Sequence, residues 1–283
     1  MSDIQSSESK TTQECLLKMM EFFHSFCVEN NLRYYMVGGT MLGAVRHHGF
    51  IPWDDDIDIG MPRKDFERLK ELSDKFQSDR YAFETVRSED PTYCFAYSKL
   101  YDTSTTLIEN TRIKLVRGLY IDIFPIDGVG DDLKKAASFY KKLHRKELLL
   151  KLRNSPDKAD RSKIKNIIIK LVRILPKAIA DEKKLSRKID QICQTHDFDS
   201  SSYSGNLVGA WGWREIMPTE FFGTPKLYTF EGISLYGVER YDDFLKQIYG
   251  NWQELPSKDK QVSHHDYYID LSTPYSKYKE TNG

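Results

Sequence analysis

The sequence contains few cysteines, no long apolar run and no net charge, and each absence excludes a class of protein. Cys15, Cys27, Cys94 and Cys193 form no CxxC pair, so we expect neither a zinc ribbon, nor a thioredoxin-type redox motif, nor a disulfide scaffold. No run approaches the ~18 apolar residues of a membrane span. Residues 1–10 lack the apolar core of a signal peptide. We therefore expect a cytoplasmic protein with reduced thiols.

The zero net charge hides a strong asymmetry along the chain. The segment between Lys134 and Lys188 has 19 Lys/Arg and 5 Asp/Glu, so the remainder is correspondingly acidic. An evenly solvated surface does not usually sort its charges in this way. The length suits one large domain or two modest ones with a full core.

Hydrophobic periodicity predicts a mixed α/β half followed by a mainly helical region. Helices are expected at residues 12–30, 40–46, 62–76 and near 241–249, and strands at 34–37, 56–59, 81–86, 94–100 and 119–124. Two or three basic helices are expected between 131 and 188. We divide the chain into a disordered tail (1–10), a catalytic core (11–130), a basic helical region (131–190) and a mixed C-terminal region that completes the site (191–283).

The densest group of chemically active residues contains four aspartates between positions 54 and 58. Asp56 and Asp58 alternate with Ile57 and Ile59, which is typical of a strand whose polar residues share one face. Like charges side by side on a face repel unless a cation lies between them. Hard oxygen ligands suit magnesium. The pattern therefore predicts a metal site at Asp56 and Asp58.

A glycine turn precedes these aspartates. Gly38, Gly39 and Thr40 follow a predicted strand and open a helix, an arrangement in which backbone N–H groups can bind phosphate. Two glycines also occur in simple turns, so the strand-borne aspartates strengthen the interpretation. Arg46 is a candidate phosphate clamp near the end of that helix, although most arginines lie on the surface.

A third carboxylate is predicted on a neighbouring strand. Asp122 lies between Ile121 and Ile123, and a charge in an apolar strand needs a partner, which a bound metal would provide. Asp127 follows Pro125, so we expect it in a turn or at a helix start. Lys99 lies on a strand-like run, either facing a phosphate or as an edge-strand lysine.

The run GGTMLGAVRHHGFIPWDDDIDIGM, followed by GLYIDIFPID, resembles the LicD family of phosphotransferases, with distant similarity to fukutin-related enzymes. The resemblance covers residues 33–127 and later patterns at 230–232 and 249–252. It implies an α/β (α+β) chain whose mixed sheet has the nucleotidyltransferase fold, with an added helical region. It also implies magnesium and a CDP-activated donor, with Asp56 and Asp58 as the metal pair and Asp122 as the third carboxylate.

Bacterial members of this family typically transfer phosphocholine from CDP-choline to a glycan such as a teichoic acid or lipopolysaccharide. The resemblance therefore implies two Mg²⁺ ions, or Mn²⁺ in their place, one at the diphosphate and one lowering the pKa of the acceptor hydroxyl. Asp122 would hold the second ion or take the proton. Trp53, beside the acidic cluster, is the candidate for contact with the choline cation.

Other functions remain open on the sequence. The donor could be CDP-ribitol or CDP-glycerol, or the chain could be a catalytically silent nucleotide-binding scaffold, although the intact set of three aspartates argues against silence. Nucleic acid is not the expected partner, because the basic segment has few aromatic residues for base stacking.

Residues 163–180 form a basic amphipathic stretch. An apolar stripe recurs at helical spacing, namely Ile164, Ile167, Ile168, Leu171, Val172 and Leu175. The stripe fits an ordinary helix packed on the core, and it also fits a helix lying on an anionic membrane surface. Because glycan acceptors of this family are often lipid-linked, the functional hypothesis is peripheral, salt-sensitive contact with the inner face of the membrane.

Overall fold

The computed structural model describes residues 2–76, 78, 80–109, 111–112, 114–156, 161–176, 180–261 and 268–282. The strands are β1 (Tyr35–Met36), β2 (Asp58–Pro62), β3 (Tyr81–Glu84), β4 (Ser98–Asp102), β5 (Thr106–Glu109), β6 (Leu115–Arg117), β7 (Tyr120–Gly130), β8 (Tyr203–Gly205), β9 (Met217–Pro218), β10 (Lys226–Phe230), β11 (Ile233–Gly237) and β12 (Tyr268–Asp270). The α-helices are α1 (Ser2–Glu29), α2 (Gly38–His47), α3 (Arg63–Glu71), α4 (Ser73–Phe76), α5 (Leu133–Asn154), α6 (Lys163–Arg173), α8 (Glu182–Cys193), α9 (Tyr241–Tyr249) and α10 (Tyr275–Asn282).

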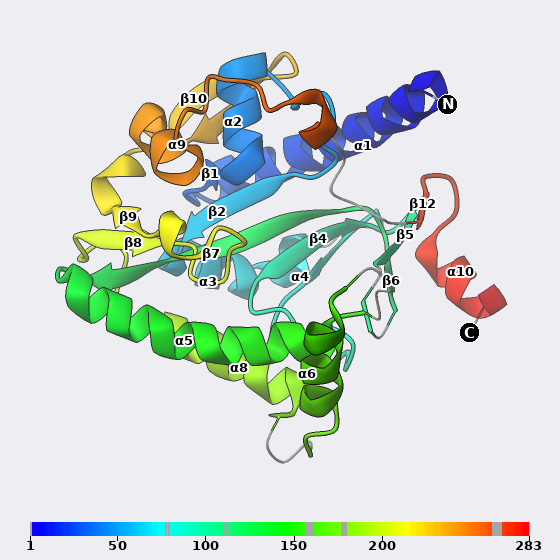
Figure 1. The fold of residues 1–283 in the computed structure, drawn as a ribbon. Helices are drawn as coiled ribbons and strands as arrows, with labels where there is room; N and C mark the ends of the chain where they lie inside the picture. Colours follow the sequence, from blue (N-terminus) through cyan, green and yellow to red (C-terminus); the bar gives the residue numbers. More distant parts are fainter. Residues whose placement is uncertain are drawn as a thin grey trace.

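A mixed sheet lies at the centre of the described chain, in the order β10–β11–β1–β2–β7–β4–β3, with β8 and β9 joined to the end of β7 (Figure 1). A smaller sheet has the order β12–β5–β6. The expected mixed α/β architecture is therefore confirmed, with a helical layer formed by α5, α6 and α8 (Figure 1).

Two apolar cores pack against the large sheet. Ile121 and Ile123 of β7 belong to the larger core, which includes residues of α1, α2, α3 and α9. Phe124 alternates to the other face and packs on the second core, formed largely by α5 and α8. The α5–α8 layer therefore covers the face of β7 that carries Asp122 and Phe124 (Figure 1).

Strand register places three charged residues side by side. β2 runs parallel to β7 with Asp58 opposite Asp122, and β4 runs antiparallel to β7 with Lys99 opposite Asp122. Residues paired in this way across neighbouring strands point to the same face. Asp58, Asp122 and Lys99 thus form one row across the sheet.

Several elements differ from the sequence-based predictions. β2 begins at Asp58 rather than Asp56, and its first residue pairs with Asp122 of β7. Asp127 was predicted in a turn or at a helix start, but it lies fully buried within β7, which continues to Gly130. Lys99 does not lie on an edge, because β4 is paired on both sides.

The N-terminal segment also differs from the prediction of a disordered tail at residues 1–10. In the structure α1 begins at Ser2 and continues without a break to Glu29. The polar composition of the segment predicted disorder, whereas the absence of glycine and proline from residues 2–29 leaves nothing to interrupt a helix.

The apolar stripe of α6 is exposed. Ile169 is the only buried residue of α6, whereas Ile164 is 73% exposed and Leu171 is 58% exposed. The interpretation of this stripe as a face packed on the core is therefore wrong; helical spacing reveals an apolar face but not what covers it. Lys177 lies outside the described residues.

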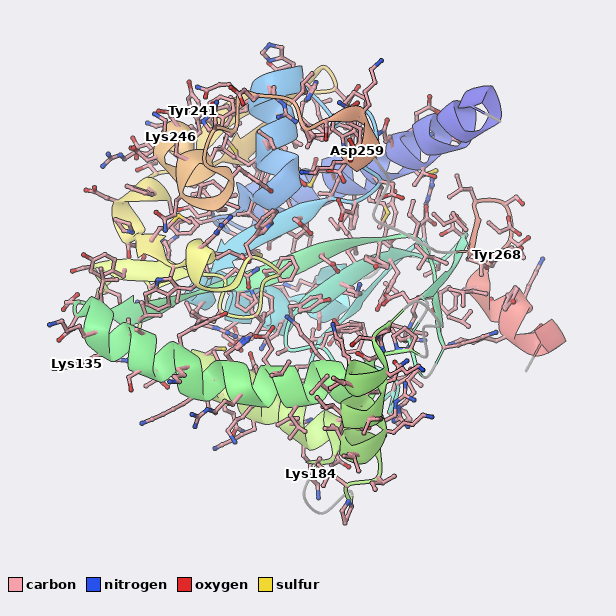
Figure 2. All side chains as sticks on the ribbon, in the orientation of Figure 1. Lys135, Lys184, Tyr241, Lys246, Asp259 and Tyr268 are labelled. Carbon is pink, nitrogen blue, oxygen red and sulfur yellow. The ribbon has the colours of Figure 1, made fainter. Side chains whose placement is uncertain are left out.

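Figure 2 shows the labelled Lys135 and Lys184 pointing outward from the same helical layer, so its outer side is basic. No helix in the described ranges is both long enough and apolar enough to span a bilayer.

Candidate functional site

Asp56, Asp58 and Asp122 line one cavity of about 530 Å³ between the sheet and the α5–α8 layer. Asp58 and Asp122 come from adjacent parallel strands, and Asp56 lies two residues before β2. The structure therefore brings the three predicted carboxylates to one cavity, although Asp56 does not lie on a strand as predicted.

The glycine turn packs directly against this acidic cluster. Gly38 has a φ of +54°, and a Cβ atom there would lie 3.2 Å from Asp58 Oδ2. At Gly39 a Cβ atom would lie 2.8 Å from Asp54 Oδ2, closer than side chains tolerate. The backbone conformation at Gly38 therefore favours glycine, and a side chain at Gly39 would displace the carboxylate of Asp54.

Thr40 has a supporting role. The backbone N–H of Asp58 donates to the Thr40 hydroxyl at 2.8 Å, and the backbone N–H of Val37 donates to the Asp58 carbonyl at 3.1 Å. Because Thr40 is buried, its side chain holds the start of β2 against α2. The glycine turn and Thr40 thus lie against Asp54 and Asp58.

The cluster is electrostatically strained. Burial raises the pKa of Asp58 well above its ordinary value, and the neighbouring carboxylates, led by Asp56, raise it further. Burial also raises the pKa of Asp122 to about 6, although Lys99 opposes this shift. Negative charges brought together in a buried place favour the binding of a cation.

Lys99 is the counter-ion of Asp122. Its side chain is 1% exposed, and Nζ lies 3.0 Å from Asp122 Oδ1 and 3.2 Å from Glu109 Oε1. The ammonium also lies over the ring of Tyr120, at 3.2 Å from the centroid. Lys99 therefore acts on the site through Asp122 rather than by pointing into the cavity, whose lining does not include it.

Two predicted residues lie away from the cavity. Arg46 lies at the far end of α2 from Gly38, where its guanidinium donates to the carbonyls of Trp252 (2.9 Å) and Glu254 (3.4 Å). Trp53 is half-buried against the larger core and lines neither cavity beside Asp58. The structure thus uses Arg46 to hold the C-terminal loop.

Sequence reasoning missed the residues that wall the cavity. On one side are aromatic rings tilted against one another, with the Tyr97 centroid 4.6 Å from that of Phe124 and 5.1 Å from that of Phe95. On the other side α5 contributes Glu147 and Lys151, which form an ion pair. Glu147 is the only acidic residue in α5, and that isolated acid in a basic helix was the available signal.

The carboxylates suit a hard cation in kind, although no group of three or more His, Cys, Asp or Glu side chains in the described ranges stands ready to enclose one. The Asp122 carboxylate forms an ion pair with Lys99, and it therefore does not join Asp56 and Asp58 in a ready-made group of three ligands. Asp56 and Asp58 are oxygen donors in a region of excess negative charge, as magnesium sites require.

The sequence that forms this site is similar to those of known proteins. The family model described as "LicD/FKTN/FKRP, nucleotidyltransferase domain" matches residues 31–154, from the start of the sheet to the end of α5. The chain is 30% identical over 257 residues to the lipopolysaccharide cholinephosphotransferase LicD of Haemophilus influenzae, covering 88% of this chain and 92% of that protein.

Two shorter matches extend the comparison. An uncharacterized protein of Rickettsia prowazekii is 38% identical over 73 residues, covering 26% of this chain and 27% of that protein. The ribitol 5-phosphate transferase FKRP of Homo sapiens is 33% identical over 69 residues, covering 23% of this chain and 14% of that protein. Since the Haemophilus protein is matched over 92% of its length, the chain belongs to the LicD family and is an enzyme of the LicD phosphotransferase type.

Proposed function

We propose that the chain transfers phosphocholine from CDP-choline to a hydroxyl group of a cell-surface glycan, of the lipopolysaccharide or teichoic acid type, and releases CMP. The observation that carries this proposal is the pairing of Asp58 with Asp122 beside the Gly38 turn, on the wall of a 530 Å³ cavity. The relative matched over most of the chain is a lipopolysaccharide cholinephosphotransferase, which supports phosphocholine as the transferred group.

In this proposal Asp56 and Asp58 hold magnesium, with Asp122 as the third carboxylate. When bound, magnesium would neutralise the diphosphate and the departing CMP, as divalent ions do in phosphoryl transfer. The backbone of Gly38 and Gly39 borders the same carboxylates closely enough for a phosphate to approach it. Lys99 keeps Asp122 oriented along the row of paired strands.

The bonds exchanged are those of a simple displacement at phosphorus. The acceptor oxygen forms a bond to the phosphorus of phosphocholine, the bond from that phosphorus to the CMP oxygen breaks, and CMP leaves with the electron pair. The hydroxyl proton passes to the carboxylate cluster. Attack at the other phosphorus would instead transfer CMP, so the products distinguish the two reactions.

Transfer of ribitol phosphate from CDP-ribitol is the second candidate, and the short match to a ribitol 5-phosphate transferase favours it over CDP-glycerol. The test is to incubate the protein with Mg²⁺, a glycan acceptor and each CDP donor separately, and to measure CMP release and the mass of the glycan. We expect CMP and a phosphocholine-bearing glycan from CDP-choline. Consumption of CDP-ribitol alone, or transfer of CMP, would refute the phosphocholine proposal.

We further propose that the enzyme works at the cytoplasmic face of a membrane, held there by α6. The exposed apolar side chains of α6 are accompanied by Lys163, Lys165, Lys170 and Arg173, and the helix contains no acidic residue. An apolar face framed by positive charge complements a bilayer with anionic headgroups. A lipid-linked glycan acceptor would be presented at such a surface.

A further inference from the structure

A second cavity, of about 80 Å³, lies beside Asp58 and is separate from the large one. Asp58, Phe124, Gly209 and Ala210 line both cavities, so the smaller one is a side chamber that adjoins the acidic cluster. Gly38, at the start of α2, also borders this chamber. A group entering it would therefore remain next to the place proposed for the donor phosphate.

The walls of the chamber are mainly aromatic and aliphatic. Phe124, Trp211, Phe222 and Phe244 contribute rings from four different segments of the chain. Phe222 and Phe244 are almost fully buried, and their ring centroids lie 5.8 Å apart in an edge-to-face arrangement. Packing of this kind fixes the walls, so the chamber is formed before any ligand arrives.

Glu215 lines this chamber together with Asp58 and comes from a segment distant in sequence from β2 and β7. Glu215 accepts a hydrogen bond from the backbone N–H of Trp211 at 2.8 Å and another from the side chain of Asn206. In the part of the chain that the structure describes, no basic side chain forms an ion pair with Glu215; Lys151, the base that most influences it, is paired with Glu147. Burial raises the pKa of Glu215 to about 7. A carboxylate placed in this way favours a cation as its partner.

The walls determine which kind of cation fits. A metal ion or a primary ammonium loses its hydration on entering and needs several oxygen ligands or acceptors in return, which aromatic walls do not supply. A quaternary ammonium donates no hydrogen bonds, and aromatic faces attract it directly. A ribitol chain carries hydroxyl groups that would be left without partners against Phe222 and Phe244.

The size of the chamber agrees with this chemistry. The chamber measures about 80 Å³ and adjoins the larger cavity, so it accepts only a compact head group. In phosphocholine only two carbon atoms separate the phosphate oxygen from the nitrogen. A donor whose phosphate lies at Asp58 and Gly38 can therefore place its head group in the chamber without stretching.

We propose that this chamber is the subsite for the quaternary ammonium group of the donor, with Trp211 and Phe124 as ring contacts and Glu215 as the charge partner. The inference rests on the proposed phosphocholine function and adds the residues that select choline over other alcohols. The enzyme would then select its donor by the head group that binds in the chamber, next to the carboxylates.

The test measures equilibrium binding by calorimetry rather than turnover, using CDP-choline, CDP-ribitol and CMP as ligands. The variants are Trp211→Ala, which removes a ring, and Glu215→Gln, which removes the charge and keeps the shape. Trp213→Ala is the matched control, because Trp213 is a nearby tryptophan that packs on Tyr140 and does not line the chamber. Thermal unfolding of each variant shows whether it is folded. If Trp211→Ala does not fold, Glu215→Gln alone still tests the proposal.

We expect both variants to weaken CDP-choline binding by at least about tenfold while CMP binding stays as in the wild type. Trp213→Ala should bind all three ligands normally. If the wild type selects CDP-choline and folded Glu215→Gln binds it equally well, the chamber assignment is overturned and the proposed function stands. If the wild type prefers CDP-ribitol or binds CDP-choline no better than CMP, the proposed function and the chamber assignment both fail.

Discussion

At the scale of single residues, the site brings negatively charged carboxylates close together. Desolvation and repulsion by the neighbouring carboxylates raise the pKa of Asp58, and Lys99 forms an ion pair with the neighbouring Asp122. Such an arrangement costs stability in the absence of a cation and is therefore a signature of function rather than of packing.

The first prediction concerns this cluster. Asp56→Asn and Asp58→Asn should each lower phosphocholine transfer by about 100-fold or more, because charge stabilisation of the reacting phosphate is lost. Neither change should lower the melting temperature of the metal-free protein, since each removes a repelling charge. Added Mg²⁺ should raise the melting temperature of the wild type but not of Asp58→Asn. The measurements are CMP release and thermal unfolding with and without Mg²⁺.

Asp55→Asn is the matched control for that experiment. Asp55 lies in the same run of aspartates but lines neither cavity beside Asp58. It should retain both transfer and the thermal response to Mg²⁺. Near-normal turnover of Asp58→Asn at saturating Mg²⁺ would remove the metal assignment.

At the scale of elements, the local sequence pattern predicted individual helices and strands, but it did not predict contacts between elements that are distant in the sequence. Periodicity predicted α9 at its observed bounds and the strands that carry Asp58 and Asp122, because these signals are contained in the segments themselves. It did not predict that Lys99 would neutralise Asp122, because that contact depends on the register between β4 and β7. The wall formed by α5 was missed for the same reason.

The helix α6 is the clearest example of a pattern that predicts an element but not its contacts, and the second prediction concerns this helix. Its helical spacing was predicted correctly, but most of its apolar stripe is exposed in the described chain, and we predict that it binds anionic lipid. Ile164→Glu and Leu171→Glu should each weaken binding to anionic vesicles by at least about tenfold, by removing apolar contact and adding a repelled charge. Since both side chains are exposed, the melting temperature should not change. Vesicle co-sedimentation at low and high salt is the measurement.

Leu227→Glu serves as the control for α6, because Leu227 of β10 is 58% exposed, as is Leu171, but belongs to another element. It should leave vesicle binding unchanged. Wild-type binding should fall at high salt and on neutral vesicles. Equal binding to anionic and neutral vesicles, or none to either, would refute lipid contact through α6.

At the scale of the whole molecule, a buried ion-pair network ties the two cores together. Arg63, at the start of α3, donates to both carboxylate oxygens of Asp127 in β7 at 2.7 Å, and to Asp190 of α8 at 2.7 Å. It therefore joins α3, β7 and α8. This explains why Asp127 lies inside a strand, contrary to the sequence-based prediction.

The third prediction follows from that network. Arg63→Met leaves Asp127 and Asp190 buried without their shared cation, which should lower the free energy of unfolding by about 3–5 kcal/mol. Lys64→Met is the control at the next position, where an exposed lysine pairs with Asp197 and Asp199; it should leave the free energy of unfolding nearly unchanged. Urea denaturation measures both. Equal midpoints and slopes for the two variants would contradict a structural role for the network.

Arg153 connects α6, with its exposed apolar stripe, to the rim of the large cavity. It belongs to the last turn of α5, donates to the carbonyls of Val172 and Leu175 at the end of α6, and stands beside Asn154 and Ser155, which line the cavity. A bilayer bound by α6 would therefore hold the rim of the cavity close to the headgroups. Acceptors anchored in that bilayer would reach the enzyme by lateral diffusion in a plane. Their effective concentration would then follow their surface density rather than their amount in bulk solution.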